Sequence, residues 1–589
     1  MKDRIPTSRR SSSIASLIKN LPQDRKVLLL SFVVGVSSGL AAAALVWLIS
    51  FIGRGVGSLE VFVEGKWPVI ILPGIGLLLS ALVVKFFARE NIGHGVTRVL
   101  VAMSRKDSVI KPHNMWTSLL SSSLTIGFGG SVGAEAPIVY TGAAIGSNFA
   151  RWSGLNYHNI TVLVGCGAAG ALAGIFKAPL AGVLFTLEVL LFGISLKSLL
   201  PMMISTLSAA FVAYVFRGTM PEFACTLTPF VMRNIPFYLV LGVLGALGSV
   251  YFTRMTLWLE DVFSRWGSTW RKWAICSLGL GLLIFVFPLL FGEGYDSVRS
   301  MLQGELPDLG FRGGSPWLVP MVLLGVFLLK VLAMTLTNAG GGVGGTFGPT
   351  LFSGAILGLF VARSLNLLGA DVPEANFALV GMAAMMAGVM KAPLTAIFLV
   401  TELSGGYMLM IPLLFTSLVA FGVSRIFERY SIYTKRIAQS GELLTHDADQ
   451  ATLTLMSTDS LIRDKYPRVS PDDTVASFAK VVSESNAAVV AVVDEQGRLE
   501  GIVNIEDVRR VLFDTSRHAS LLVSDIMVKP HTWVTAGEPM IEVMHKFEAA
   551  DAWRMPVLDS EGHYLGFISK SRMLAAYRDV LREQLSSGD

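Results

Sequence analysis

Residues 129–137 read Gly-Gly-Ser-Val-Gly-Ala-Glu-Ala-Pro, and they place one carboxylate, Glu135, inside sequence that is otherwise apolar. A carboxylate at the centre of a membrane helix costs about 2.5–3.5 kcal/mol, so Glu135 is a functional candidate by default. Glycine permits close backbone approach and proline suits a first helical turn, so the pattern predicts a loop that opens into a helix near Pro137. The free N–H groups of a helix start attract anions. We therefore predict a small-anion site that the Glu135 side chain can occupy instead.

A second copy of this pattern follows 212 positions later, with Phe347 in the place of Glu135. The copied stretches are Gly-Gly-Val-Gly-Gly-Thr-Phe-Gly-Pro at 341–349 and, behind each loop, Lys-Ala-Pro-Leu at 177–180 and 391–394, leading to Glu188 and Glu402. Motifs repeated in the same order indicate a duplicated membrane domain. Such repeats in transporters are often inverted, with broken helices that point at the substrate.

The composition is that of a membrane protein with many spans. Hydrophobic residues make up 52% of the 589 residues and charged residues 15%, whereas soluble domains carry about 25% charged residues. The mean hydropathy is +0.59. The net charge of +5 is modest and gives no sign of a nucleic-acid surface. Three scattered cysteines, Cys166, Cys225 and Cys276, have neither metal nor disulfide spacing and are predicted to be buried thiols.

The order of segments predicts a membrane domain over 27–440, after a basic segment over 1–26 that the positive-inside rule places in the cytoplasm. Long apolar segments are expected to span the membrane at 27–51, 68–87, 199–216, 236–258, 273–291, 318–336 and 411–427. Segments too short to span are expected around the first motifs, at 115–128, 137–150, 160–174 and 179–196. Such short segments are tolerated at membrane depth where they are buried or line a cavity.

From about residue 439 the chain becomes charged and carries strand and turn signals. Two β-branched runs around a polar turn, at 489–503 and 555–568, predict β-hairpins. Each follows an amphipathic helical stretch, at 475–484 and 540–549. Two similar units in tandem indicate an α/β cytoplasmic module.

The membrane part resembles the CLC chloride channels and chloride/proton exchangers, and the tail resembles a tandem CBS pair over 461–515 and 521–580. The matches are Gly-His-Gly-Val-Thr at 93–97 to the family's GSGIP motif, Gly-Ala-Glu-Ala-Pro at 133–137 to G(K/R)EGP, Gly-Thr-Phe-Gly-Pro at 345–349 to GxFxP, and Tyr433 to a late tyrosine. The resemblance implies an all-α membrane domain of two inverted repeats followed by an α/β CBS module.

The resemblance also implies a function without enzymatic chemistry. Family members are homodimers in the lipid bilayer with one anion pathway in each subunit, and they need no cofactor or metal. Chloride would be held by backbone amides of Thr346 and Phe347. Tyr433 and the His94-Gly95 loop would complete the site, and Glu135 would be the gate.

Three departures from the family pattern bear on mechanism. His94 replaces a serine, and Ala134 and Ala136 replace a basic residue and a glycine. Val189 stands where exchangers carry an internal proton-transfer glutamate, with Glu188 beside it as a substitute or a structural residue. Valine carries no proton, so this position favours a voltage-gated-type chloride channel regulated by the CBS pair. Chloride/proton antiport is the alternative, and chloride, nitrate and fluoride all remain open as the anion.

The CBS resemblance implies ATP, ADP or AMP in the cleft between the units. In the first unit Asn504 and Asp507 match the positions that hold a ribose. In the second, Ser569 is followed by Arg572 in place of the aspartate, so at most one complete ribose site is expected. A dimerisation scaffold without a ligand is the alternative interpretation.

Two other function classes are weaker. Residues 129–133 fit the GxSxG pattern of a serine hydrolase, with Ser131 as the nucleophile, but a strand before the serine and a placed histidine are needed and are not predicted. A membrane sensor with a vestigial pore is disfavoured by the intact motifs at Glu135 and Phe347. The expected location is a bacterial inner membrane, with the N-terminus and the CBS tail in the cytoplasm.

Overall fold

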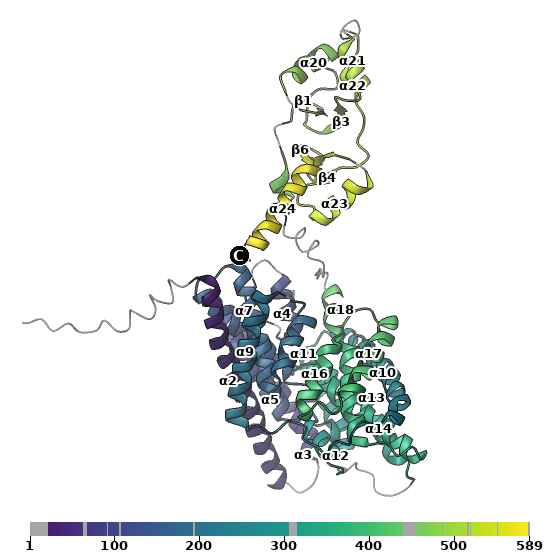
Figure 1. Ribbon diagram of the computed structural model, residues 1–589. Helices are drawn as coiled ribbons and strands as arrows, with labels where there is room; N and C mark the ends of the chain where they lie inside the picture. The colour runs from purple at the N-terminus through teal and green to yellow at the C-terminus, as the bar shows by residue number, and fades with distance from the viewer. Residues whose placement is uncertain are drawn as a thin grey trace, which may run out of the picture. The chain divides into compact units, whose positions relative to one another are not determined.

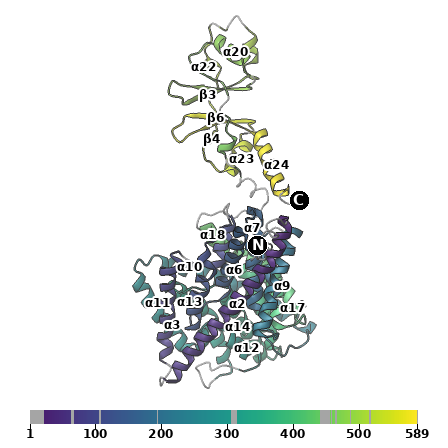
Figure 2. The same ribbon diagram turned by 90° about the vertical axis from the view of Figure 1, so that its left-hand side faces the viewer.

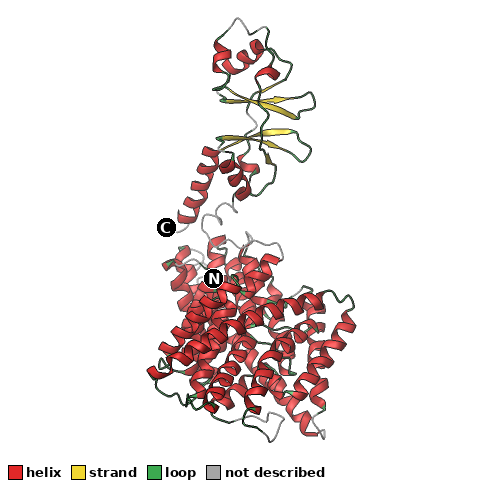
Figure 3. Cartoon of the chain, turned by 90° about the vertical axis from the view of Figure 1, so that its right-hand side faces the viewer, coloured by secondary structure: helices red, strands yellow, loops and turns green. Residues whose placement is uncertain are grey.

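The computed structural model describes residues 22–62, 67–90, 92–104, 108–192, 195–305, 315–439, 456, 458–463, 466–485, 487–514, 518, 520–550 and 552–586. Most of the predicted cytoplasmic segment 1–26 lies outside these residues. The chain divides into two compact units at residue 444, and each is described by itself. In the described residues, strands are confined to the second unit, whereas the first is helical (Figure 3).

The helices of the first unit are α2 (Gln23–Phe62), α3 (Pro68–Val83), η1 (Val84–Ala88), α4 (Gly95–Ser104), η2 (Pro112–Met115), α5 (Thr117–Gly127), α6 (Glu135–Trp152), α7 (Tyr157–Phe176), α8 (Pro179–Glu188), α9 (Leu196–Arg217), η3 (Met232–Asn234), α10 (Ile235–Ser264), α11 (Thr269–Val286), η4 (Pro288–Leu290), α12 (Tyr295–Leu302), α13 (Leu318–Ala339), α14 (Phe347–Leu367), α15 (Glu374–Met390), α16 (Pro393–Ser404), α17 (Met410–Phe427) and α18 (Ile432–Gln439). Figures 1 and 2 show them as one bundle in which α2 runs beside α9. Among the described helices, nine are long and apolar enough to cross a membrane.

Several predicted boundaries were wrong. Helix α6 begins at Glu135 itself rather than near Pro137, and α2 extends well beyond the predicted 27–51. Helix α7 has 20 residues and is long enough to span, although its segment was predicted to be too short. Its start is fixed by the Asn156 side chain, which accepts the N–H of Asn159 at 3.0 Å. Its many glycines and alanines allow close packing against neighbouring helices. Because they interrupt the apolar pattern, the sequence predicts a shorter helix.

Two glycine-rich loops meet inside the first unit, one before α6 and one before α14. Gly133 donates its N–H to the carbonyl of Gly345 at 3.1 Å, and Gly345 donates back to Gly133 at 2.7 Å, so the loops run antiparallel. At the matching positions, Gly129 and Gly341 have φ of 98° and 101°, values that favour glycine. Antiparallel pairing of duplicated loops is what inverted repeats require, and the predicted fold class is confirmed.

Helices α8 and α16, which start at the two Lys-Ala-Pro-Leu motifs, cap each other. Glu188 accepts the N–H groups of residues 394 and 395, at 3.1 and 2.7 Å. Glu402 accepts those of residues 180 and 181, at 3.1 and 2.9 Å. Each carboxylate thereby satisfies N–H groups that a helix start leaves free. The two helices lie antiparallel, and this relation also fits an inverted repeat.

Glycines bring the helices behind the loops into backbone contact. A Cβ added at Gly167 in α7 would lie 1.9 Å from the carbonyl oxygen of Gly142 in α6. The second repeat has the same arrangement, because a Cβ at Gly381 in α15 would lie 2.3 Å from the carbonyl oxygen of Gly354 in α14. Small residues at helix contacts let membrane helices approach closely. These contacts fix the positions of α6 and α14, and with them the loops at their starts.

The second unit consists of two similar α/β halves (Figure 3). Its elements are η5 (Asp459–Leu461), β1 (Arg468–Val469), α20 (Val475–Ser483), β2 (Val489–Val493), β3 (Leu499–Asn504), α21 (Arg509–Phe513), α22 (Val523–Ile526), β4 (Val534–Thr535), α23 (Met540–Ala549), β5 (Arg554–Leu558), β6 (Tyr564–Ser569) and α24 (Lys570–Ser586). The sheets have the orders β1-β2-β3 and β4-β5-β6, and each contains the predicted antiparallel hairpin. An apolar cluster that includes Ala491 and Phe567 joins the halves.

Replacing Gly167 by alanine tests the helix contact. The added methyl group has to push α6 and α7 apart, so G167A is expected to lower the stability of the protein by about 2 kcal/mol. Gly57→Ala in α2 is the matched control, because a Cβ there meets nothing within 4 Å. Thermal unfolding in detergent measures both variants. Equal unfolding temperatures for G167A and G57A would contradict the packing argument.

Candidate functional site

Glu135 is the first residue of α6 and is only 1% exposed. One carboxylate oxygen accepts the N–H of Gly348 at 3.1 Å, in the first turn of α14. The other accepts a short hydrogen bond from the Tyr295 hydroxyl. The free N–H groups of a helix start form a ready anion site. The Glu135 side chain therefore lies where the N-terminus of α14 would receive an anion.

Two hydroxyl groups offer further donors to an anion, one from Thr346 at the start of α14 and one from Tyr433 of α18. The hydroxyl groups of Thr346 and Tyr433 lie near each other. Both are buried, and neither has a hydrogen-bond partner with acceptable geometry among the described residues. Buried polar groups in native proteins are almost always partnered, so an unpartnered pair invites a ligand. Phe347 packs against the rings of Phe176 and Phe185, with ring centroids 5.7 and 6.0 Å apart.

His94 lies just before α4, where its ring faces α10 and α18. Its Nε2 atom is 3.8 Å from Glu260, and the Arg436 guanidinium also binds that carboxylate. Arg436 follows Tyr433 by nearly one turn of α18. Gly95 serves close packing, since a Cβ there would lie 2.2 Å from the carbonyl oxygen of Ala136. The imidazole thus has an acidic partner beside the loop in which the family resemblance expects an anion ligand.

Val189 and Glu188 have different surroundings from Glu135. Val189 is buried and apolar. Beside it, both carboxylate oxygens of Glu188 are committed to the start of α16, and one also accepts the Thr395 hydroxyl at 2.7 Å. The contacts of Glu188 are therefore those of a helix cap.

A buried lysine and a second glutamate contact the loop before Glu135, and neither was predicted from the sequence as a site residue. Lys330 of α13 is fully buried, and its ammonium donates to Ser131 Oγ at 2.8 Å and to the Gly292 carbonyl at 3.1 Å. Glu293 accepts the N–H of Ala134, the residue directly before Glu135, at 2.8 Å. A lone lysine in an apolar helix is a functional candidate on its own, and that signal was present in the sequence.

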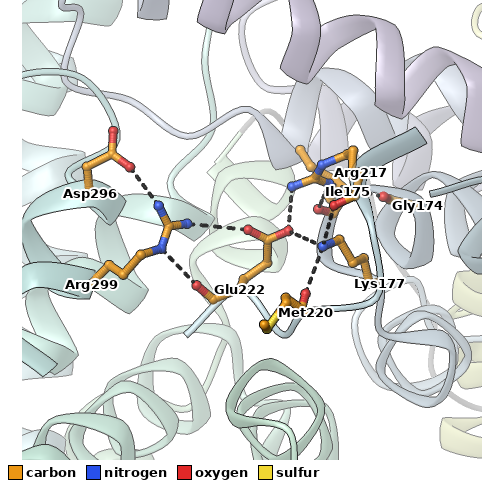
Figure 4. A network of polar contacts seen from close by, with 8 residues as sticks. All are labelled: Gly174, Ile175, Lys177, Arg217, Met220, Glu222, Asp296 and Arg299. Carbon is orange, nitrogen blue, oxygen red and sulfur yellow. Dashed lines mark hydrogen bonds and ion pairs between the residues drawn. The ribbon is translucent and has the colours of Figure 1, made fainter. Parts of the chain in front are cut away.

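A cavity of about 700 Å³ opens beside these residues, and we call it the vestibule. It is lined by residues that include Arg54, Ala134, Arg217, Glu222, Phe223, Glu293, Tyr295, Asp296 and Arg299. Figure 4 shows how its charged wall is tied together around the Glu222 carboxylate. Glu222 pairs with Arg217, with Lys177 at 3.4 Å and with Arg299 at 3.5 Å. Arg299 also pairs with Asp296 at 3.0 Å.

The serine-hydrolase alternative finds no support in this geometry. Helix α5, not a strand, precedes the loop of Ser131. The Ser131 hydroxyl is fully buried and accepts the hydrogen bond from Lys330. The described residues contain no group of three or more histidine, cysteine, aspartate or glutamate side chains that could hold a metal. The described cysteines are free thiols, with Cys166 and Cys276 buried and Cys225, against expectation, half-buried.

The predicted nucleotide positions lie at the ends of two matching strands in the second unit. Asn504 ends β3, and its amide donates to Asp507 at 3.1 Å. Ser569 ends β6, and its hydroxyl accepts the N–H of Arg572 at 3.3 Å. Both Asn504 and Asp507 are exposed. The first half of the second unit thus presents an amide and a carboxylate at this position, whereas the second half presents a hydroxyl alone.

Residues 75–425 match the model of the voltage gated chloride channel family. The chain belongs to this family. Residues 458–514 and 523–579 match the CBS domain. Members of this family are anion transporters and channels, so the chain is a membrane protein that moves anions.

Named relatives fall on both sides of the channel and exchanger divide. The chain is 28% identical to "H(+)/Cl(-) exchange transporter ClcA" of Salmonella paratyphi A, over 77% of this chain and 96% of that relative. It is 29% identical to "Voltage-gated ClC-type chloride channel ClcB" of Escherichia coli O157:H7, over 70% and 99%.

Solved structures share the fold. A slow cyanobacterial Cl⁻/H⁺ antiporter has a TM-score of 0.63 at 24% identity, over 71% of this chain and 98% of that one. A eukaryotic CLC transporter has a TM-score of 0.62 at 18% identity, over 95% and 99%. The second structure extends the likeness across nearly the whole chain.

Replacing Lys330 by methionine tests whether the lysine holds the gate region together. The change leaves the Ser131 hydroxyl and the Gly292 carbonyl without a donor, and each lost partner costs about 1–3 kcal/mol. K330M is therefore expected to lower the free energy of unfolding by about 3 kcal/mol. Lys85→Met is the control, because Lys85 is exposed. If K330M and K85M both unfold at the same temperature as the wild type, this role of Lys330 is contradicted.

Proposed function

We propose that the protein exchanges chloride for protons across the membrane, with Glu135 as the group that both blocks the anion path and carries the proton. The observation that carries the proposal is the hydrogen bond from Gly348 to the Glu135 carboxylate at the start of α14. Ionised, the carboxylate competes with chloride for the helix N-terminus. Protonated, it loses its charge, releases that position and admits the anion. One side chain then links proton binding to anion entry.

Chloride fits the remaining donors. The hydroxyls of Thr346 and Tyr433 supply two hydrogen-bond donors, and the first turn of α14 supplies backbone N–H groups and a positive partial charge. We propose that these groups hold a chloride ion once Glu135 withdraws. The His94 imidazole lies beside the Glu260 carboxylate, which also pairs with Arg436. Because the ring faces this carboxylate, we place it at the edge of the anion site rather than at its centre.

Sidedness follows from the proposed topology. With a cytoplasmic N-terminus, α2 carries the chain to the outer side of the membrane. The vestibule is lined by the second half of α2, including Val46 and Arg54, so it opens outward. Glu135 then faces the outer solution through the vestibule, whereas His94 lies on the cytoplasmic side.

Passive chloride conduction is the second candidate, and Val189 favours it. Valine cannot carry a proton to the cytoplasmic side, so the sequence predicts this channel function. Exchange is supported instead by the relative ClcA of Salmonella paratyphi A, which is an H⁺/Cl⁻ exchange transporter. Since Glu188 is held as a helix cap, we propose that water completes the inner half of the proton path.

We also propose that the protein is a homodimer. Helices α9 and α17 expose large apolar side chains, among them Leu207, Phe211, Phe415 and Leu418. Lipid covers such faces as well as a second subunit does. The polar ends of α8 and α16 cap each other within one chain, so the dimer contact is expected to be apolar.

Glu135→Gln tests the gate directly. Glutamine cannot ionise, so E135Q is expected to conduct chloride without moving protons and to lose the dependence of chloride flux on outer pH. Chloride efflux and proton uptake in liposomes measure both effects. The control is Glu374→Gln, which removes a carboxylate paired with Arg363 away from the gate and should retain exchange. Proton movement that survives in E135Q would contradict the assignment.

For the second unit we propose one adenine-nucleotide site at Asn504 and Asp507, which regulates transport. The exposed carboxylate at the end of β3 is placed to accept ribose hydroxyl groups. ATP is expected to raise the unfolding temperature of the full-length protein, as any ligand of the native state does. Asp507→Ala should abolish that shift, whereas Arg572→Ala should preserve it. An ATP shift that persists in D507A would contradict the site.

A further inference from the structure

Glu293 stands between the vestibule and the gate, in the loop that leads into α12. It lines the vestibule. Its carboxylate also accepts the N–H of Ala134 at 2.8 Å. Ala134 is the residue directly before Glu135 and caps the start of α6. Glu293 therefore lines the vestibule and also contacts the backbone directly before Glu135.

The same loop meets the gate at a second point. Tyr295, two residues after Glu293, donates its hydroxyl hydrogen to the Glu135 carboxylate. The rings of Phe223 and Phe176 pack around Tyr295, with centroids 5.5 and 6.5 Å away. Glu135 itself is only 1% exposed. A proton that arrives from the vestibule thus meets the half-buried Glu293 before it can meet Glu135.

Lys330 holds the backbone of this loop in place. Its ammonium donates to the carbonyls of Gly292 and Glu293, at 3.1 and 3.4 Å, and to Ser131. It also lies 4.6 Å from the centroid of the Phe352 ring. These contacts involve the backbone of Glu293, so they leave its carboxylate free to change its protonation state.

The charges that face the Glu293 carboxylate come from three elements. They are Glu135 on α6, Lys330 on α13 and Asp296 on α12. Across the vestibule, Arg299 is paired with Glu222 and Asp296. Two neighbouring buried carboxylates repel each other when both are ionised, so a proton on one of them favours the ionised form of the other.

We propose that Glu293 is the proton-loading residue of the gate. A proton from vestibule water binds a Glu293 carboxylate oxygen, and it then passes to the Glu135 carboxylate. One O–H bond breaks and one forms, and Glu293 returns to its ionised state. The inference rests on the proposed role of Glu135 as a proton carrier, and it extends that role to a second residue.

The test compares two variants that each remove one negative charge from the vestibule. Glu293→Gln keeps the carbonyl oxygen that accepts the Ala134 N–H but cannot carry a proton. Asp296→Asn is the matched control for charge, because the Asp296 side chain is 99% exposed and pairs with Arg299 rather than with the backbone before Glu135. Protein reconstituted in one orientation receives a rapid drop in pH on the vestibule side, and chloride flux is followed in time.

In the wild type, the flux should rise quickly after the pH drop. E293Q should respond about tenfold more slowly, since positioned proton transfer contributes at least that much to a rate. D296N should respond like the wild type. A wild-type response in E293Q would overturn the proposal. An equal delay in both variants would also overturn it, because the charge of the vestibule would then be the cause.

The double variant E135Q/E293Q separates proton loading from damage to the pore. If Glu293 acts only through Glu135, chloride flux in the double variant should equal that in E135Q. A lower flux would show that E293Q harms the pore and would overturn the proposal. Failure of proton exchange as such would show instead in the wild type, as chloride flux without proton movement. The two failures are therefore distinguishable.

Discussion

Two backbone hydrogen bonds between Gly133 and Gly345 hold the starts of α6 and α14 together. Neither position has room for a side chain. A Cβ at Gly133 would lie 2.1 Å from the Glu135 carboxylate, and one at Gly345 would lie 2.6 Å from the Ala136 side chain. Two helix N-termini that meet at one point form a favourable binding site for one small anion. The glycine contacts of α6 with α7 and of α14 with α15 fix the two helices that these loops begin.

The two repeats are alike in backbone and differ in the residue that begins the helix after each loop. The first repeat places a carboxylate at the start of its helix, and the second places Phe347 there. The carboxylate reaches across to the start of α14, where it takes the position of an anion. The phenylalanine instead joins an aromatic cluster with Phe176 and Phe185. One half of the duplicated site thus supplies a carboxylate, and the other supplies an apolar side chain.

The sequence predicts the parts of this arrangement that repeat or that are rare. Glu135 stands out because a carboxylate in apolar sequence is costly, and the copied motifs reveal the duplication. The start of α6 at Glu135 and the full length of α7 were missed, because both depend on contacts between distant segments. Glu293 and Tyr295 were missed for a similar reason, since the fold brings their loop to the gate from about 160 positions away. Lys330 was visible as a lone charge in an apolar helix and was overlooked.

Position 189 carries a valine and therefore no carboxyl group. The coupling of chloride transport to proton transport is thus the central claim to test. The decisive measurement uses the purified wild-type protein in liposomes, under a chloride gradient and no initial pH gradient. The account predicts that chloride leaving the liposomes drives protons inward, against the gradient that then builds up, and that the reversal potential is displaced from the chloride equilibrium potential. A reversal potential that follows chloride alone, with no proton uptake, would contradict exchange and make the protein a passive chloride conductor.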